Sequence, residues 1–182
     1  MRRIGALAVL IVLVAGAALA RAPLSAPALP GYRILFAGNP PTGGHWNLSA
    51  KRRTIAGHPA LCLSFTTRTP EGVEFSAIGC GGGTLRGLHN VFPVASGYGG
   101  NVDTNLVGGF TVARARAAVI SFADGKRVRV ATQLGPPSFR RALGERIRFF
   151  VVNAFTHTRA PARSVAVLNA PGRLIGRSKI GS

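Results

Sequence analysis

Residues 61–80 read LCLSFTTRTPEGVEFSAIGC, two runs of β-branched and aromatic side chains on either side of a Pro-Glu-Gly turn signal at 70–72. A three-residue loop at this signal, with proline where its fixed φ suits a type I turn, predicts an antiparallel hairpin. Pairing outward from that loop sets Cys62 directly opposite Cys80. The stretch therefore predicts a cross-strand disulfide, which closes a loop of about 18 residues and adds about 3 kcal/mol in the chain-entropy model.

The same register assigns the side chains of the hairpin to two faces, because side chains alternate along a strand. The cysteines share a face with polar pairs, such as Arg68 opposite Glu74. The opposite face is predicted to be the core face, and its apolar members are Leu61, Leu63, Phe65, Val73 and Phe75. The hairpin is thus expected to pack this apolar face against the rest of the domain.

A glycine-rich run, GCGGGTLRG at 79–87, follows the second strand of this hairpin and at first looks like a phosphate-binding loop. It lacks the lysine and hydroxyl that open a helix in a nucleotide-binding loop, and it lacks the dinucleotide-binding glycine spacing. We interpret the glycines as a hinge beside the disulfide, at a place where backbones pack closely. A small anion-binding nest is the alternative.

The rest of the chain is also strand-like, because short runs rich in Val, Ile, Phe and Thr recur between turn signals. The predicted strands lie at 32–36, 46–53, 60–67, 73–78, 106–112, 117–123, 126–133, 146–153, 164–169 and 173–176. One helical turn is predicted at 137–144, with Ser138 as its N-cap and Gly144 at its end. This pattern favours an all-β fold, an immunoglobulin-like antiparallel sandwich with an N-terminal disulfide-linked hairpin.

A second hairpin is predicted in ISFADGKRVRV, residues 120–130. A two-residue loop would mix apolar and charged side chains on one face, whereas a three-residue loop at 123–125 separates them. In the favoured register Gly125 takes a left-handed conformation, and Arg127 and Arg129 share the outer face. Asp124 is then a turn residue rather than a catalytic one.

The N-terminus has the charged, apolar and small-residue regions of a secretory signal peptide, with an uncleaved anchor as the alternative. No transmembrane segment is expected after cleavage, and the mature chain is expected to be secreted or associated with the cell envelope. The predicted organisation is a signal peptide at 1–22, a disordered Pro/Ala-rich tether at 23–31 and one domain at 32–182. That domain divides into a disulfide half (32–95), a glycine-rich connection (96–109) and a C-terminal half (110–182).

The chain is very basic, with 23 Lys and Arg against 5 Asp and Glu. Such charge attracts polyanions without specific nucleic-acid recognition, so the expected partners are anionic envelope polymers or another exported protein. The alternative is that abundant arginine reflects a GC-rich coding sequence. The residues predicted to bind anions are Arg127, Arg129, Arg146 and Arg148.

The sequence contains few residue patterns that could form a catalytic site, and no catalytic residue, cofactor or metal site is predicted. The four histidines have no metal-ligand spacing, and no G-x-S-x-G motif is present. The alternative function is a secreted hydrolase whose site is assembled in loops from His45, His89, His157 and Asp103.

Several stretches carry a resemblance to a known class: GHWNLSA through the cysteine pair, GGFTVARARAAVISFADGKRVRVAT, RIRFFVVNAF and SVAVLNAPGRLI. They resemble small exported bacterial proteins of high-GC, actinobacterial-type organisms. In those proteins a disulfide-pinned hairpin that begins with tryptophan precedes an immunoglobulin-like sandwich. The resemblance covers most of the mature chain and implies a fold and a location, but no activity.

Overall fold

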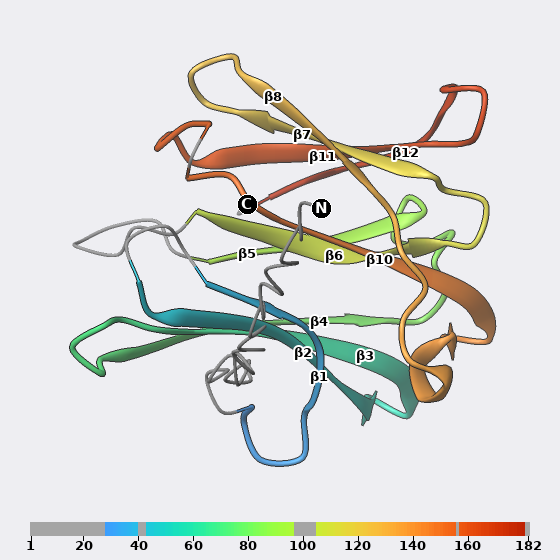
Figure 1. Ribbon diagram of the computed structural model, residues 1–182. Helices are drawn as coiled ribbons and strands as arrows, with labels where there is room; N and C mark the ends of the chain where they lie inside the picture. The colour runs from blue at the N-terminus through green and yellow to red at the C-terminus, as the bar shows by residue number, and fades with distance from the viewer. Residues whose placement is uncertain (1–27, 40–42, 97–104, 156, 181–182) are drawn as a thin grey trace, which may run out of the picture.

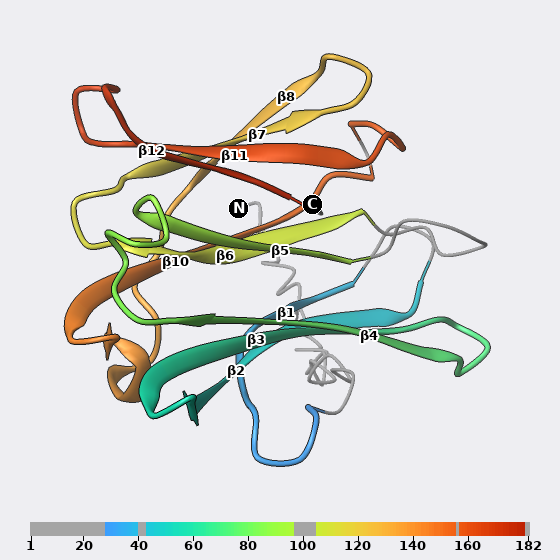
Figure 2. The same ribbon diagram turned by 180° about the vertical axis from the view of Figure 1, so that it is seen from behind.

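The computed structural model describes residues 28–39, 43–96, 105–155 and 157–180, so the predicted signal peptide lies outside the described ranges. The described segments are all-β and antiparallel, with a single turn of 3-10 helix and no α-helix. They contain twelve strands in three four-stranded sheets, which stack as three layers (Figures 1 and 2). The all-β class predicted from the sequence is confirmed.

The N-terminal sheet has the order β1-β2-β3-β4 and contains β1 (Arg33–Gly38), β2 (His45–Ile55), β3 (His58–Arg68) and β4 (Glu74–Gly82). The middle sheet has the order β5-β6-β10-β9 and contains β5 (Val91–Ser96), β6 (Leu106–Val112), β10 (Glu145–Asn153) and β9 (Arg141–Ala142). The outer sheet has the order β12-β11-β7-β8 and contains β12 (Leu174–Lys179), β11 (Ala162–Leu168), β7 (Ala117–Phe122) and β8 (Arg127–Ala131). The middle sheet lies between the other two (Figure 1).

The middle and outer sheets have the strand order of an immunoglobulin domain. Lettered in chain order from β5 as strand A, the middle sheet reads A-B-E-D and the outer sheet reads G-F-C-C′. Antibody domains pin this sandwich with a disulfide and a tryptophan between its sheets. Here Cys62, Cys80 and Trp46 all lie in the N-terminal sheet, so the disulfide stabilises the added layer.

Strand β6 is buried along its whole length, which explains why its sequence LVGGFTV does not alternate between apolar and polar residues. Toward the N-terminal sheet, a Cβ atom added at Gly108 would lie 2.8 Å from the Phe65 ring. Toward the outer sheet, a Cβ atom added at Gly109 would lie 2.6 Å from the Phe150 ring. The two glycines therefore allow aromatic rings to pack directly on the β6 backbone from both sides.

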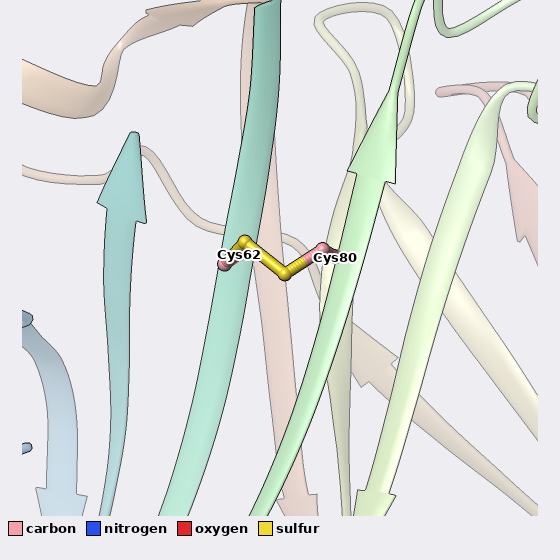
Figure 3. The surroundings of a disulfide bond; sticks show 2 residues. All are labelled: Cys62 and Cys80. Carbon is pink, nitrogen blue, oxygen red and sulfur yellow. A yellow bond between two sulfur atoms is a disulfide. The ribbon is translucent and has the colours of Figure 1, made fainter. Parts of the chain in front are cut away.

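Hairpin β3–β4 has the predicted register. Cys62 pairs with Cys80, and their side chains form the predicted disulfide across the two strands (Figure 3). The backbone N–H of Thr69 donates to the carbonyl of Val73 across the predicted three-residue loop. A disulfide of this kind indicates an oxidising environment.

The predicted core face of this hairpin is right for β3 and wrong for the loop end of β4. Leu63 and Phe65 are fully buried, whereas Val73 and Phe75 expose 52% and 45% of their surfaces. The loop end of the hairpin extends past the ends of β5 and β6 (Figure 1). Register determines which way a side chain points, but the length of the neighbouring layer determines whether that side chain is covered.

The hinge predicted beside the disulfide is also wrong. Residues 79–82 continue β4 and pair with β3, so their backbone groups belong to the sheet ladder. A Cβ atom added at Gly79 would lie 2.7 Å from Val94, and one added at Gly81 would lie 2.9 Å from Phe92. The glycines let β4 lie close against β5, which is the close packing that the sequence suggested.

Strand β5 is not among the strands predicted from the sequence. Its run VFPVAS contains Pro93, which lowers the strand signal, yet proline is acceptable because β5 is an edge strand of the middle sheet. The predicted glycine-rich connection at 96–109 includes the first residues of β6, and its part at 97–104 lies outside the described residues. In the predicted tether, 23–27 lies outside them, and Leu29 accepts a backbone hydrogen bond from Tyr32.

Most of the predicted helical turn at 137–144 is not helical in the structure. Only Pro137–Phe139 forms a 3-10 turn, and Ser138 lies inside this turn rather than at its N-cap. Strand β9 follows, and Leu143 and Gly144, both with positive φ, connect it to β10. Two consecutive left-handed residues are typical of a two-residue hairpin turn.

Candidate anion-binding surfaces

Hairpin β7–β8 has the predicted loop at 123–125 and determines the orientation of two predicted anion-binding residues. Ile120 pairs with Val128, and Gly125 has a φ of 82°, as expected for the left-handed position. In this register Arg127 and Arg129 lie together on the outer face of the outer sheet, and both are exposed.

Two further cations share that face from the opposite edge of the sheet, Arg177 and Lys179 of β12. The strand registers align all four in two rows, Arg129-Val119-Ala166-Arg177 and Arg127-Ser121-Ser164-Lys179. We call Arg127, Arg129, Arg177 and Lys179 the basic face. The alternation of charge in β12 is the only sequence signal that could have revealed this second edge.

The basic face has a regular geometry. Neighbouring strands lie about 4.8 Å apart, so the two charged edges are separated by about 14 Å. Residues two apart on one strand are separated by about 7 Å. The half-buried side chains between the edges are Val119, Ser121, Ser164 and Ala166, and all are small. The face is therefore a strip of small side chains with a positively charged rim on each side.

No carboxylate lies within the described strands of the outer sheet. Glu71 and Glu74 lie in the β3–β4 hairpin, Glu145 begins β10, and Asp124 lies in the β7–β8 loop. None of the four cations of the basic face forms an ion pair or a side-chain hydrogen bond with another described residue. Their charges are available to a ligand.

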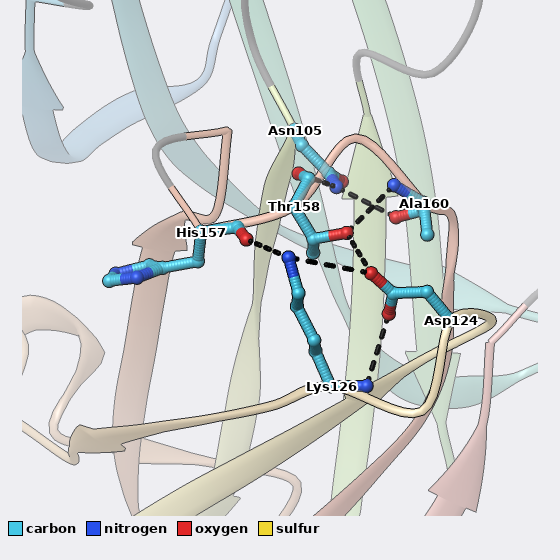
Figure 4. Close-up of polar contacts among 6 residues, drawn as sticks. All are labelled: Asn105, Asp124, Lys126, His157, Thr158 and Ala160. Carbon is cyan, nitrogen blue, oxygen red and sulfur yellow. Dashed lines mark hydrogen bonds and ion pairs between the residues drawn. The ribbon is translucent and has the colours of Figure 1, made fainter.

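Asp124, the carboxylate nearest in sequence to this face, is held in a polar network (Figure 4). Its Oδ1 accepts a hydrogen bond from the Lys126 backbone N–H at 3.1 Å, and its Oδ2 accepts one from the Thr158 hydroxyl at 2.6 Å. Lys126 Nζ donates to the His157 carbonyl at 2.9 Å. The Asn105 amide donates to the Thr158 carbonyl at 3.2 Å. The network ties the β7–β8 loop to the segment after β10.

The same contacts determine the protonation of Asp124. The hydrogen bond from Thr158 holds the pKa of this carboxyl below its ordinary value, and the backbone N–H and ammonium of Lys126 act in the same direction. A carboxylate stabilised in its charged form is a weak proton acceptor. The network therefore supports the structural role that the sequence predicted for Asp124.

The other two predicted anion-binding residues, Arg146 and Arg148, lie in β10 of the middle sheet and not on the basic face. Arg148 donates from Nε to Thr132 Oγ1 at 2.8 Å and from Nη2 to the Thr132 carbonyl at 2.7 Å. Burial, and then the charge of Arg116, lower the pKa of the Arg148 guanidinium. Arg148 is thus engaged in joining β10 to the segment after β8.

Arg146 lines an open cleft of about 410 Å³, which we call the arginine cleft. Arg86, from the connection between β4 and β5, and Arg114, from the turn between β6 and β7, line it as well. The remaining lining residues are Asn90, Val112, Ala113 and Glu145. No motif in the sequence links the three arginines, because only the stacking of the strands brings them together.

A second recess, of about 340 Å³, lies beside the turn between β9 and β10 and is also rich in arginine. Here Arg52 donates to the carbonyls of Ser138 and Arg141 at 2.5 and 2.6 Å. Its guanidinium also lies 5.9 Å from the centre of the Phe139 ring. This arginine joins the N-terminal sheet to the middle sheet, so we assign it a structural role.

The residues considered for a hydrolase are not gathered by the described part of the structure. His89 lies just before β5, which begins opposite Thr111 at the end of β6, whereas His157 lies beside the start of β6. His45 begins β2 in another sheet, and Asp103 lies outside the described residues. Among the described residues, no group of three or more His, Cys, Asp or Glu could hold a metal ion.

Comparison with known proteins finds no matching family model, no matching curated protein and no matching solved structure. In the described ranges, no helix has the length and apolar character needed to cross a membrane.

Proposed function

We propose that the protein is an exported, non-enzymatic module with an immunoglobulin-like sandwich that binds anionic polymers through the basic face, in the cell envelope or the extracellular space. The observation that carries this proposal is the pair of cationic rows across the outer sheet, with no carboxylate in its described strands. The disulfide and the signal-peptide pattern at 1–22 support export. The resemblance to small exported bacterial proteins points the same way.

The strip suits an extended polyanion better than a folded protein partner. A linear polymer can lie between the two rims and meet two cations on each side, about 7 Å apart along the strand. The centre of the strip has no aromatic or large apolar anchor, and such anchors usually dominate protein interfaces. Binding energy then comes mainly from phosphate or carboxylate contacts and from released counterions.

The test compares variants of equal net charge. We would replace Arg127, Arg129, Arg177 and Lys179 together by Gln and measure affinity for linear polyphosphate as a function of salt. Each lost contact removes about one released counterion, so the slope of log affinity against log salt should become shallower by roughly 3 to 4. Affinity at low salt should fall by at least about tenfold.

The matched control replaces four exposed arginines elsewhere by Gln, namely Arg33, Arg53, Arg68 and Arg140. It changes the net charge of the chain by the same amount but leaves the basic face intact. The control should keep most of the affinity and the salt slope. Equal losses in both variants would show that the charge acts only through composition, and would overturn the proposal.

A further inference from the structure

We propose that the arginine cleft is a second binding site, specific for a dianionic phosphate group such as the terminal phosphate of a phosphate monoester. The cleft lies where β6 ends and β10 begins, and its lining residues come from the middle sheet and from connections, not from the outer face that carries the polymer strip. The proposal therefore stands independently of the function proposed above.

The segment that carries Arg86 is held rigidly in place. Leu85, next to it, is fully buried in the core. The N–H of Asn90 donates to the Leu85 carbonyl at 2.7 Å, and the Asn90 side-chain amide donates to the Ile175 carbonyl at 2.5 Å. His89 and Asn90 both have positive φ, a conformation that histidine and asparagine adopt more readily than most non-glycine residues. Arg86 thus extends from a loop that is anchored at both ends.

The backbone at the other two arginines is also held in place by hydrogen bonds. Arg114 lies in a turn closed by a hydrogen bond from the Ala115 N–H to the Val112 carbonyl, and Ala115 is fully buried. Arg146 lies within β10 and pairs with Arg141 of β9. The fixed backbone positions keep the three arginine side chains around one cleft, which favours a shared site over scattered surface charges.

The charges of the cleft match a dianion. None of the three arginines forms an ion pair or a side-chain hydrogen bond with another described residue. Glu145 is the only carboxylate that lines the cleft, so the lining carries an excess of two positive charges. Three like charges that share a cleft repel one another, and a bound dianion relieves this repulsion.

The donor chemistry points to phosphate. A guanidinium has five N–H donors in a planar fork that matches the paired oxygens of a phosphate. A phosphate monoester carries three terminal oxygens and close to two negative charges near neutral pH. The volume of about 410 Å³ is within the range of about 300–1,000 Å³ of small-molecule sites, so it leaves room for the group that bears the phosphate.

Glu145 gives this site an internal test. Its carboxylate repels the anion, while it can accept a hydrogen bond from a hydroxyl or ammonium on the group attached to the phosphate. Glu145→Gln should therefore tighten the binding of inorganic phosphate. A merely structural role for the cleft residues predicts no such gain.

The experiment measures binding to the full mature chain by calorimetry. The three probes are inorganic phosphate, glycerol 1-phosphate and the diester dimethyl phosphate. Arg114→Gln and Arg146→Gln should each weaken binding of the monoester about tenfold, the usual effect of one charge-assisted hydrogen bond. Arg163→Gln, at an exposed site outside the cleft, is the matched control and should not change it. Thermal unfolding of each variant shows that the fold is intact.

The outcomes separate the possible sources of the phosphate. Stronger binding of glycerol 1-phosphate than of inorganic phosphate identifies an esterified phosphate as the ligand, and equal binding identifies the free ion; both support the site. Equal binding of the diester, or affinity unchanged in both arginine variants, overturns it. The fourfold Gln variant of the basic face should still bind the monoester, so failure of the polymer proposal and failure of this one are distinguishable.

Discussion

The N-terminal sheet and the outer sheet both pack one face against the middle sheet, yet they differ in what holds them and in what they expose. The N-terminal sheet has two strands of 11 residues and a disulfide, and glycines let it approach the middle sheet closely. The outer sheet has strands of 5 to 7 residues, and a polar network around Asp124 fastens its β7–β8 hairpin.

Their outward faces differ in the same way. On the outward side of the N-terminal sheet the disulfide is accompanied by hydroxyl groups, such as Ser49, which donates to the Ser64 carbonyl at 3.3 Å, and Cys62, Ser49 and Ser64 are all fully buried. The outer sheet presents the basic face. Repulsion among like charges lowers stability, and a surface bearing them needs support from elsewhere in the fold. The N-terminal sheet thus carries the disulfide, while the outer sheet carries the exposed cations of the basic face.

The largest effect should come from the packing of the N-terminal sheet. Phe65→Ala removes a fully buried ring that rests on Gly108, and it should lower the free energy of unfolding by about 3–5 kcal/mol. Phe75→Ala, in the same hairpin, removes a ring that is 45% exposed and should cost less than about 1.5 kcal/mol. Urea unfolding measures both. Similar losses would mean that the loop end of the hairpin is covered after all.

The disulfide should have the next largest effect. Replacing Cys62 and Cys80 together by Ala opens a loop with a sequence separation of 18 residues, and it should cost about 3 kcal/mol in denaturant unfolding. Reduction of the wild-type chain should give a comparable loss, which serves as the control. Binding to the basic face should be unchanged under conditions where the variant is folded. A change in polymer affinity would contradict the separation of roles between the two sheets.

The smallest effect should come from the network of the outer sheet, and it should depend on pH. The hydrogen bond from Thr158 depresses the pKa of Asp124 in the native state. The stabilisation is therefore present above the ordinary pKa of an aspartate, about 3.9, and disappears as the pH falls through the depressed native value. Asp124→Asn should be less stable than wild type at neutral pH, and the gap should narrow on acidification below about pH 4.

Thr158→Val provides the complementary variant, since it keeps the carboxylate and removes its hydroxyl partner. It should also be destabilised at neutral pH, and its stability should decrease less steeply than that of wild type as the pH is lowered. Parallel pH profiles for wild type and both variants would show that folding does not lower the pKa of Asp124, and would contradict this prediction. Thermal unfolding across pH 2–7, a range that spans the titration of carboxylates, measures these profiles.

Much of the local structure could be predicted from the sequence. Both hairpin registers are correct, including the pairing of Cys62 with Cys80 and the left-handed Gly125. Strand β5 could not be predicted because it contains a proline, which is rare within strands. The turn around Leu143 could not be predicted because it lacks the Asn-Gly or Asp-Gly sequence that usually marks a two-residue hairpin turn. Of the predicted anion-binding residues, Arg127 and Arg129 share a face, whereas Arg146 lines a separate cleft and Arg148 bonds to Thr132.

By itself, the sequence determined the all-β class, the disulfide and the hairpin registers, because a turn and the alternation of side chains act over a few residues. The stacking of three sheets was decided only by the tertiary structure. It covers β6 on both faces, and it leaves Phe75 beyond the edge of its neighbour. It also brings Arg86, Arg114 and Arg146 into one cleft. These features depend on how far each layer extends over the next, and no local pattern along the chain encodes that distance.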